Sequence, residues 1–246
     1  MSVRCCRGES TAAGSQRTPC TTSERGAQPG APELSTNTVL GRGARWLQSL
    51  IDRRRRSVGL LQSPQAWEAQ YAAGKWDFLA DLPELARSSV LAGYICHLKP
   101  GAAVLDVGCG QGVLLQRLPA GCYARYVGID VSSSAIAAAQ KQCSERSRFV
   151  AADCERYSPE EWFDVIVFNE VLYCLREPLR TVEHYARSLE PDGLILVSMC
   201  TAARGSSTIL WRLKQSYTLL DQVRISHSGR RVSWVCAALR RMSGGC

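Results

Sequence analysis

The sequence lacks the features of several large protein classes. No run of about 18 apolar residues could span a bilayer, and no apolar segment of the secretory type opens the chain. The twelve cysteines are scattered between Cys5 and Cys246, with no Cys-x-x-Cys pair and no paired histidine spacing. This distribution argues against a zinc site and against a disulfide framework. We therefore expect reduced thiols in a cytoplasmic protein, with no transmembrane segment and no metal.

Positive charge is scarce outside the first quarter of the chain. The net charge is +8, but residues 1–57 hold ten arginines against four acids, which leaves +2 for all later residues. A nearly neutral remainder offers no basic surface for a phosphate backbone, so a nucleic-acid partner is disfavoured. We expect residues 1–57 to be a disordered basic tail, rich in Ser, Thr, Gly and Pro. Organelle targeting by the tail, or contact of 44–56 with a membrane or nucleic acid, are the alternatives.

A domain is expected over 58–241, because apolar strands and helices alternate there. Residues 64–73 and 83–98 have helical patterns, the first with Trp67 and Tyr71 on one face. The alternation that follows predicts a Rossmann-like α/β sandwich of three layers, with a mostly parallel sheet and an antiparallel hairpin at its C-terminal edge. Pro191-Asp192-Gly193 predicts a turn just before the fifth strand. The expected strands are 103–107, 126–130, 148–152, 163–168, 194–199, 217–225 and 231–239, and the expected helices between them are 112–118, 132–142, 177–189 and 207–215.

Residues 104–112, Val-Leu-Asp-Val-Gly-Cys-Gly-Gln-Gly, are the most informative stretch. A buried strand ends in Asp106 and opens into glycines at alternate positions, Gly108 and Gly110 among them. Glycine adopts positive φ and lets a ligand approach the main chain without meeting a Cβ. The stretch therefore predicts a strand that delivers its backbone to a ligand.

Polar residues also end three later strands. They are Asp130, which follows Val-Gly-Ile, then Asp153 with Cys154, and then Asn169 with Glu170. In open α/β sheets, ligands bind beyond the carboxyl ends of the strands. An acid about 20 residues past a glycine loop can accept hydrogen bonds from ribose hydroxyls, and Asp130 is so placed. These strand ends predict a nucleoside site.

The glycine spacing selects among nucleosides. A dinucleotide fingerprint needs Gly-x-Gly-x-x-Gly, whereas this chain has Gly108-Cys-Gly110-Gln-Gly112-Val113. No basic residue lies between 107 and 116 to meet a phosphate, and no P-loop is present. A nucleoside without phosphates fits better. S-adenosyl-L-methionine is such a molecule, and Asp106 can attract its ammonium group.

The same residues resemble the class I S-adenosylmethionine-dependent methyltransferases. Residues 104–112 resemble their first motif and Gly128-Ile-Asp130-Val131-Ser132 their second. Residues 151–154 resemble the adenine-binding motif, and 163–172 resemble motif IV. Leu189-Glu-Pro-Asp-Gly is similar to the late Leu-x-Pro-Gly-Gly, with Asp192 in place of one glycine. The Trp67…Asp77 segment is similar to small-molecule members such as the nodulation-factor N-methyltransferase.

The resemblance implies a role for each matching position. Asp106, Gly108 and Gly110 would hold the methionine moiety, and Asp130 with Val131 would hold the ribose. Asp153 would meet the adenine amino group, with the Cys154 backbone N–H at a ring nitrogen. Asn169 would lie near the transferred methyl. Either Tyr71 or Trp67 would close over the cofactor, or both would be ordinary packing residues.

The acceptor is less defined by the sequence. Glu170 and Tyr173 follow the fourth strand and are the candidate catalytic residues facing the acceptor. Asn169-Glu170-Val-Leu departs from the Asn/Asp-Pro-Pro-Tyr/Phe of many nucleic-acid amino methyltransferases, which favours a small-molecule acceptor. In-line transfer to either an N or an O nucleophile is expected, and the oligomeric state stays open. The alternatives are an inactive cofactor- or partner-binding module and an NAD-dependent oxidoreductase.

Overall fold

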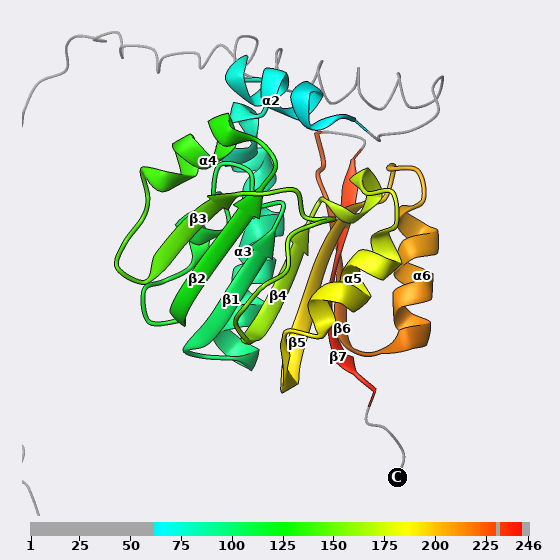
Figure 1. The fold of residues 1–246 in the computed structure, drawn as a ribbon. Coiled ribbons are helices and arrows are strands. Elements are labelled where there is room, and N and C mark those ends of the chain that lie inside the picture. The colour runs from blue at the N-terminus through cyan, green and yellow to red at the C-terminus, as the bar shows by residue number, and fades with distance from the viewer. Residues whose placement is uncertain (1–61, 230–231, 243–246) are drawn as a thin grey trace, which may run out of the picture. The chain divides into compact units, whose positions relative to one another are not determined.

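A computed structural model describes residues 62–229 and 232–242. The expected tail, 1–57, and residues 58–61 of the expected domain lie outside these ranges. In the described residues one sheet has the strand order β3-β2-β1-β4-β5-β7-β6 (Figure 1). Strands β1 to β5 are parallel, and β7 and β6 are antiparallel to their neighbours. The strands are β1 (Ala102–Val107), β2 (Tyr123–Asp130), β3 (Ser147–Ala151), β4 (Phe163–Asn169), β5 (Leu189–Cys200), β6 (Tyr217–Ser226) and β7 (Ser233–Arg241).

Helices cover both faces of this sheet. Leu91 and Ile95 of α3 (Leu82–Leu98) and Ile136 of α4 (Ser133–Gln140) belong to the core on one face. Helices α5 (Pro178–Ala186) and α6 (Ser206–Ser216) pack in the core on the other face, with Val182 and Leu213 among their buried residues. The three-layer α/β fold with a C-terminal edge hairpin is therefore confirmed.

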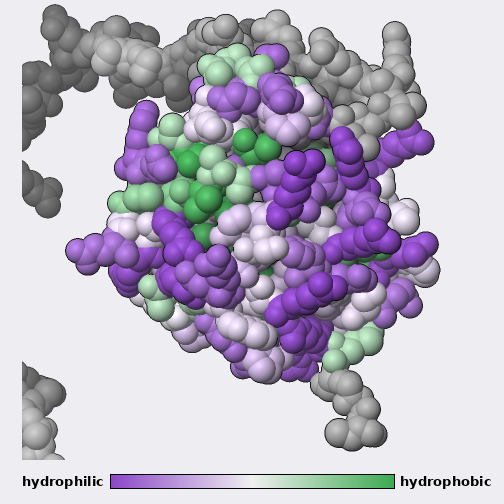
Figure 2. Space-filling view, viewed as in Figure 1, coloured by the Kyte–Doolittle hydropathy of each residue, from purple (hydrophilic) through white to green (hydrophobic). Residues whose placement is uncertain are grey.

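Helix α2 (Pro64–Ala72) lies across one end of the sheet rather than on a face (Figure 1). Ser63 caps it by accepting a hydrogen bond from the Ala66 N–H at 3.3 Å, and Pro64 occupies its first turn. Helix α2 has no fully buried residue. Apolar side chains gather below it on the face shown in Figure 2, whereas most of that face is hydrophilic.

Two expected elements differ from the structure. Residues 112–118 form turns and a short 3-10 helix, η2 (Leu115–Arg117), rather than an α-helix. Few residues separate Gly112 from Pro119, and the position before a proline disfavours helical backbone. The fifth strand begins at Leu189 and runs through Pro191–Gly193, where the pairing with β4 shifts register between Phe163 and Val165. The expected turn is thus an irregularity inside β5.

The expectation of reduced thiols is wrong for two cysteines. A disulfide joins Cys96, in the last turn of α3, to Cys122, which precedes β2, with a Cα–Cα distance of 4.8 Å. The partners are 26 residues apart, so sequence spacing gave no sign of the pair. The other cysteines of the described ranges form no disulfide: Cys109, Cys143, Cys154, Cys174, Cys200 and Cys236. No helix in the described part of the chain is long and apolar enough to cross a membrane.

Candidate active site

The parallel register brings the polar strand ends together. Asp106 of β1 lies between Gly128 of β2 and Val167 of β4, and Asp130 pairs with Ala151 of β3. A cavity of about 610 Å³ opens beyond these carboxyl ends and continues under α2. Of the residues singled out from the sequence, all but Asp106 line it: Trp67, Tyr71, Gly108, Gly110, Asp130, Val131, Asp153, Cys154, Asn169, Glu170 and Tyr173.

The glycine loop leaves β1 in a left-handed conformation. Gly108 has φ 74° and Gly110 has φ 54°, values that side-chain-bearing residues rarely adopt. A Cβ on Gly108 would lie 2.6 Å from Cγ2 of Val171, and one on Gly110 would lie 2.7 Å from the Tyr71 hydroxyl oxygen. Glycine is therefore required at both positions by conformation and by space.

Asp130 fastens this loop to the end of β2. Its two carboxylate oxygens accept hydrogen bonds from the Gly110 N–H and the Ser132 N–H, each at 2.9 Å. The side chain is 8% exposed, and burial raises its pKa against the opposing effect of these backbone donors. Asp130 thus organises the loop in addition to lining the cavity, a task that its position in the sequence did not reveal.

Asp106 lies behind the loop. It is 1% exposed and accepts a hydrogen bond from the Tyr126 hydroxyl at 2.5 Å, while its Oδ1 has no hydrogen-bond partner among the described residues. Burial raises its pKa to about 7, although the Tyr126 hydrogen bond opposes the shift. Asp106 does not line the cavity wall, but its carboxyl group can still act electrostatically on a molecule in the cavity.

Asp153 and Cys154 follow β3 at another part of the wall. Asp153 accepts a hydrogen bond from the Glu155 N–H at 3.0 Å, which stabilises the turn. The Cys154 carbonyl accepts one from the Tyr185 hydroxyl at 3.0 Å, and burial raises the pKa of the Cys154 thiol to about 12. A thiol of this kind stays protonated near neutral pH, so Cys154 is a packing surface and not a nucleophile.

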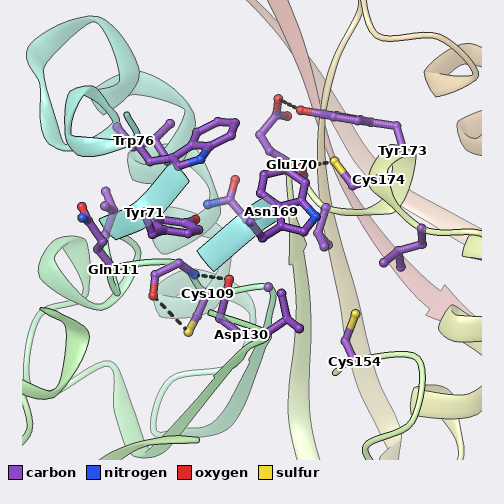
Figure 3. Close-up of a pocket in the computed structure, with 18 of the residues that line it drawn as sticks. Tyr71, Trp76, Cys109, Gln111, Asp130, Cys154, Asn169, Glu170, Tyr173 and Cys174 are labelled. Atoms are coloured by element: carbon purple, nitrogen blue, oxygen red, sulfur yellow. Dashed lines mark hydrogen bonds between the residues drawn. The ribbon is translucent and has the colours of Figure 1, made fainter. Parts of the chain in front are cut away.

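The end of β4 carries the most constrained residue of the site. Glu170 has φ 63°, and among the residues that the structure describes it is the non-glycine residue with positive φ. Its Oε1 accepts from the Ser198 hydroxyl at 2.8 Å, and its Oε2 accepts from the Tyr173 hydroxyl at 2.7 Å and the Cys200 N–H at 3.2 Å. These donors fix the carboxylate beside the cavity (Figure 3). Burial and the Glu170 charge raise the pKa of Tyr173, which therefore remains a donor.

Helix α3 contributes two charged residues that the sequence analysis missed. Glu84 and Arg87 are only 2% and 4% exposed, and both line the cavity. Arg87 donates to Asn169 Oδ1 and, at 3.3 Å, to Glu84 Oε2. Their spacing was the signal in the sequence, because Glu84, Arg87 and Ser88 lie on the same helix face as the buried Leu91 and Ile95.

The α2 end of the cavity is aromatic. Trp76 lies 5.4 Å from Trp67, 6.0 Å from Tyr71 and 6.1 Å from Phe78 between ring centroids. Figure 3 places Tyr71 and Trp76 beside the loop that carries Cys109 and Gln111. A hydrogen bond of 2.9 Å from Gln111 to Asp77 connects that loop to η1 (Asp77–Ala80).

Helix α2 is held over the cavity by Glu68, another residue that the sequence analysis missed. Glu68 accepts hydrogen bonds from the Ser132 hydroxyl at 2.7 Å, the Ser134 N–H at 3.2 Å and the Ser134 hydroxyl. These donors, with the Ser134 hydroxyl first, lower the pKa of Glu68. The contact places Tyr71 against Gly110.

A family model described as "Methyltransferase domain" matches residues 75–235, more than half of the chain. The chain belongs to this family. The methyltransferase is 29% identical over 182 residues to nodulation protein S of Sinorhizobium fredii, covering 69% of this chain and 83% of the relative. It is 37% identical over 100 residues to trans-aconitate 2-methyltransferase of Escherichia coli, covering 39% of this chain and 38% of that relative.

The fold is also that of solved methyltransferases. The N-methyltransferase NodS from Bradyrhizobium japonicum WM9, in complex with S-adenosyl-L-homocysteine, superposes with a TM-score of 0.58 at 21% identity, covering 82% of this chain and 100% of that chain. The predictions of enzyme class, Rossmann-like fold and S-adenosyl-L-methionine as cofactor are confirmed. The roles of the individual site residues stay predictions.

Proposed function

We propose that the enzyme transfers a methyl group from S-adenosyl-L-methionine to an N or O nucleophile of a small molecule, inside the cavity beyond β1–β4. The observation that carries the proposal is one cavity that joins the glycine loop, Asp130 and Asp153 to the charged and aromatic wall under α2. The glycine loop with Asp130 and Asp153 suits a nucleoside, and the wall under α2 leaves room for an acceptor.

The described residues fit the cofactor. The left-handed glycine loop leaves backbone open where a Cβ would intrude, and the buried Asp106 Oδ1 has hydrogen-bonding or electrostatic capacity left for an ammonium group. In this assignment Gly108 and Gly110 hold the methionine moiety and Asp130 with Val131 holds the ribose. The adenine lies at Asp153 and Cys154.

The cofactor, when bound, supplies a methyl group on a positively charged sulfur that leaves as a neutral thioether. The protein therefore needs to align the nucleophile and exclude water, and orientation can lower a barrier by roughly 7–11 kcal/mol in favourable cases. Asn169 and Glu170 present polar oxygens at the end of β4, and Tyr71 and Trp67 cover the cavity from α2. Glu170 orients the acceptor in this proposal, and Tyr173 positions the Glu170 carboxylate.

A small acceptor suits the setting better than a nucleic acid does. Arg156 and Arg176, the other cations that line the cavity in the described residues, are exposed and lie among Asp153, Glu155 and Glu177. The ion pair between Arg156 and Asp153 reduces the positive charge there, whereas recognition of a phosphate backbone needs a basic patch. The enzyme's relatives include a protein titled trans-aconitate 2-methyltransferase, a name that denotes a small acceptor. The cytoplasmic location is part of the proposal, and what supports it is the six cysteines that form no disulfide in the described residues.

The proposal is tested first by cofactor binding. Titration calorimetry should detect S-adenosylhomocysteine and find no comparable affinity for NAD. Asp130→Ala should weaken binding by about 1–3 kcal/mol, since it removes a buried hydrogen-bonding partner and releases the Gly110 N–H. Asp192→Ala is the matched control, because Asp192 is exposed and lies near the start of β5, away from the strand ends that form the site. Tight NAD binding without S-adenosylhomocysteine binding contradicts the proposal, and an unchanged affinity of Asp130→Ala contradicts the ribose assignment.

Turnover is tested by a metabolite screen that reads S-adenosylhomocysteine release. We expect release with at least one class of small acceptor. Cofactor binding with no turnover across the pool would favour an inactive binding module instead.

A further inference from the structure

A buried arginine of α3 contacts the end of β4. Arg87 is 4% exposed, and its guanidinium donates to Oδ1 of Asn169 and, at 3.3 Å, to Oε2 of Glu84. Both Arg87 and Asn169 line the cavity. The contact therefore joins α3 to the strand end at which the proposed function places the transferred methyl group.

Arg87 remains charged in this position. Burial opposes the charge, but the carboxylates of Glu170 and Glu84 hold the pKa of Arg87 above its ordinary value. A charged guanidinium has five N–H donors in a planar fork and no acceptor. Any polar atom that contacts it must therefore accept a hydrogen bond.

This requirement fixes the side-chain amide of Asn169. An asparagine amide has an oxygen that accepts and a nitrogen that carries two donors. If the amide were turned over, its N–H groups would face those of Arg87, and buried donors on both sides would lack a partner. The amide oxygen consequently lies toward Arg87, and the nitrogen is the other arm of the amide.

The amide nitrogen of Asn169 is available to a bound molecule. It donates no hydrogen bond to the described residues, and Figure 3 shows the side chain reaching into the cavity from the end of β4. The strand register also places Asn169 beside the glycine loop, since Phe168 pairs with Val107 and Gly108 comes next on β1. Two oriented donors thus lie next to the loop that is assigned to the methionine moiety.

We propose that Arg87 is a positioning residue, which turns the Asn169 amide so that its N–H groups donate to an oxygen of the molecule bound in the cavity. The inference rests on the proposed function for the identity of that molecule, and it adds the polarity of the contact. The oxygen belongs to the amino-acid part of the cofactor or to the acceptor. An ammonium group has donors only and does not suit this position, which agrees with its assignment to Asp106.

The role of Arg87 can be measured directly because the chain has two asparagines, Asn37 and Asn169. Enzyme labelled with ¹⁵N in the asparagine side chains gives two amide signal pairs, and the pair missing in Asn169→Asp is that of Asn169. Arg87→Lys keeps the positive charge but replaces the planar fork with one ammonium group on a flexible chain. We expect ¹⁵N relaxation to show a rigid Asn169 amide in the unmodified enzyme and a mobile one in Arg87→Lys, with the Asn37 pair unchanged.

An amide of Asn169 that is equally rigid in both proteins, or mobile in the unmodified enzyme, overturns the inference. If Arg87→Lys does not fold, the spectrum of the unmodified enzyme and the variant below still decide it.

Asn169→Asp tests the direction of the contact. The carboxylate keeps an oxygen for Arg87, and this contact becomes charge-assisted, so the thermal stability should be retained. The second oxygen replaces the two donors and repels an oxygen of the ligand. We expect the affinity for the molecule that carries this oxygen to fall about tenfold to a hundredfold. Gln140→Glu, the same chemical change at an exposed position outside the cavity, is the matched control.

Two measurements on Asn169→Asp locate the oxygen. Weaker binding of S-adenosylhomocysteine, but not of 5′-methylthioadenosine, which lacks the amino-acid part, places the oxygen on the cofactor. Retained affinity for S-adenosylhomocysteine with a raised KM for the acceptor from the metabolite screen places it on the acceptor. A variant that equals the unmodified enzyme in both measurements overturns the inference. A protein that binds no S-adenosylhomocysteine, or a screen that finds no acceptor, counts against the proposed function instead, and the relaxation measurement still decides the role of Arg87.

Discussion

Asp106 and Asp130 are buried carboxyl groups at neighbouring strand ends, and their surroundings give them different tasks. Asp130 accepts two backbone N–H groups and so organises the glycine loop. Asp106 has one hydroxyl donor and a buried oxygen without a hydrogen-bond partner in the described structure. A carboxylate with few donors is costly to ionise in the interior, which is why burial raises the pKa of Asp106 to about 7.

This shift predicts a pH-dependent stability. Because the pKa of Asp106 is raised in the folded state from its ordinary 3.8, its contribution is fully present below about pH 4 and is lost as the pH rises through about 7. Asp106→Asn keeps an acceptor for Tyr126 but does not titrate. Between pH 5 and pH 8 the free energy of unfolding of the unmodified enzyme should fall by roughly 2–3 kcal/mol relative to this variant. Urea unfolding without cofactor at both pH values measures the difference, and a constant difference contradicts the prediction.

At the scale of elements, α2 has an unusual position. It buries no residue completely, and its aromatic contacts run from Trp67 and Tyr71 to Trp76. Polar contacts from Glu68 to Ser132 and Ser134 connect it to the N-terminus of α4, where a negative side chain is favoured by the helix dipole. Few contacts therefore decide whether Tyr71 stays over the glycine loop.

Glu68→Gln should loosen α2. A neutral amide interacts less well with three donors and with the helix end, so Tyr71 would cover the loop for a smaller fraction of time. We expect affinity for S-adenosylhomocysteine to fall about threefold to tenfold, and amide exchange in residues 64–72 to accelerate. Gln65→Ala, at an exposed position of the same helix, is the matched control. Unchanged exchange in Glu68→Gln would show that α2 is held by other contacts.

At the scale of the whole molecule, the disulfide between Cys96 and Cys122 joins the end of α3 to the start of β2. Both elements pack in the core on the same face of the sheet, through Ile95 and Tyr126. A covalent link between residues 26 positions apart restricts the unfolded chain by an amount equivalent to about 3–4 kcal/mol in the chain-entropy model.

Removing this link should lower stability without reaching the active site. Replacement of both Cys96 and Cys122 by alanine should reduce the free energy of unfolding by about 2–4 kcal/mol while the affinity for S-adenosylhomocysteine is retained. Cys143→Ala, at an exposed cysteine outside the disulfide, is the control. Non-reducing peptide mapping reads the link directly. Equal stability with and without reductant contradicts the prediction.

Much of the fold followed from local patterns. Strands β1 to β4 are apolar runs that end in polar residues, and Ser132 caps α4 as its position suggested, accepting from the Ala135 N–H at 3.1 Å. The expected helix over 112–118 failed, because the space between Gly112 and Pro119 is too short for one. The buried face of α3 extends beyond its apolar residues, because Glu84, Arg87 and Ser88 are buried along with Leu91 and Ile95.

The sequence by itself determined the family, the sheet and the cofactor, because each strand and the residues at its end are contiguous in the chain. Parallel strands bring those ends to one edge whatever the details of packing. Only the tertiary structure decided the acceptor part of the cavity. Arg87 and Asn169 are 82 residues apart, and their contact depends on how α3 lies against the sheet. That packing decides which charged side chains are buried together, since no local pattern in the sequence specifies it.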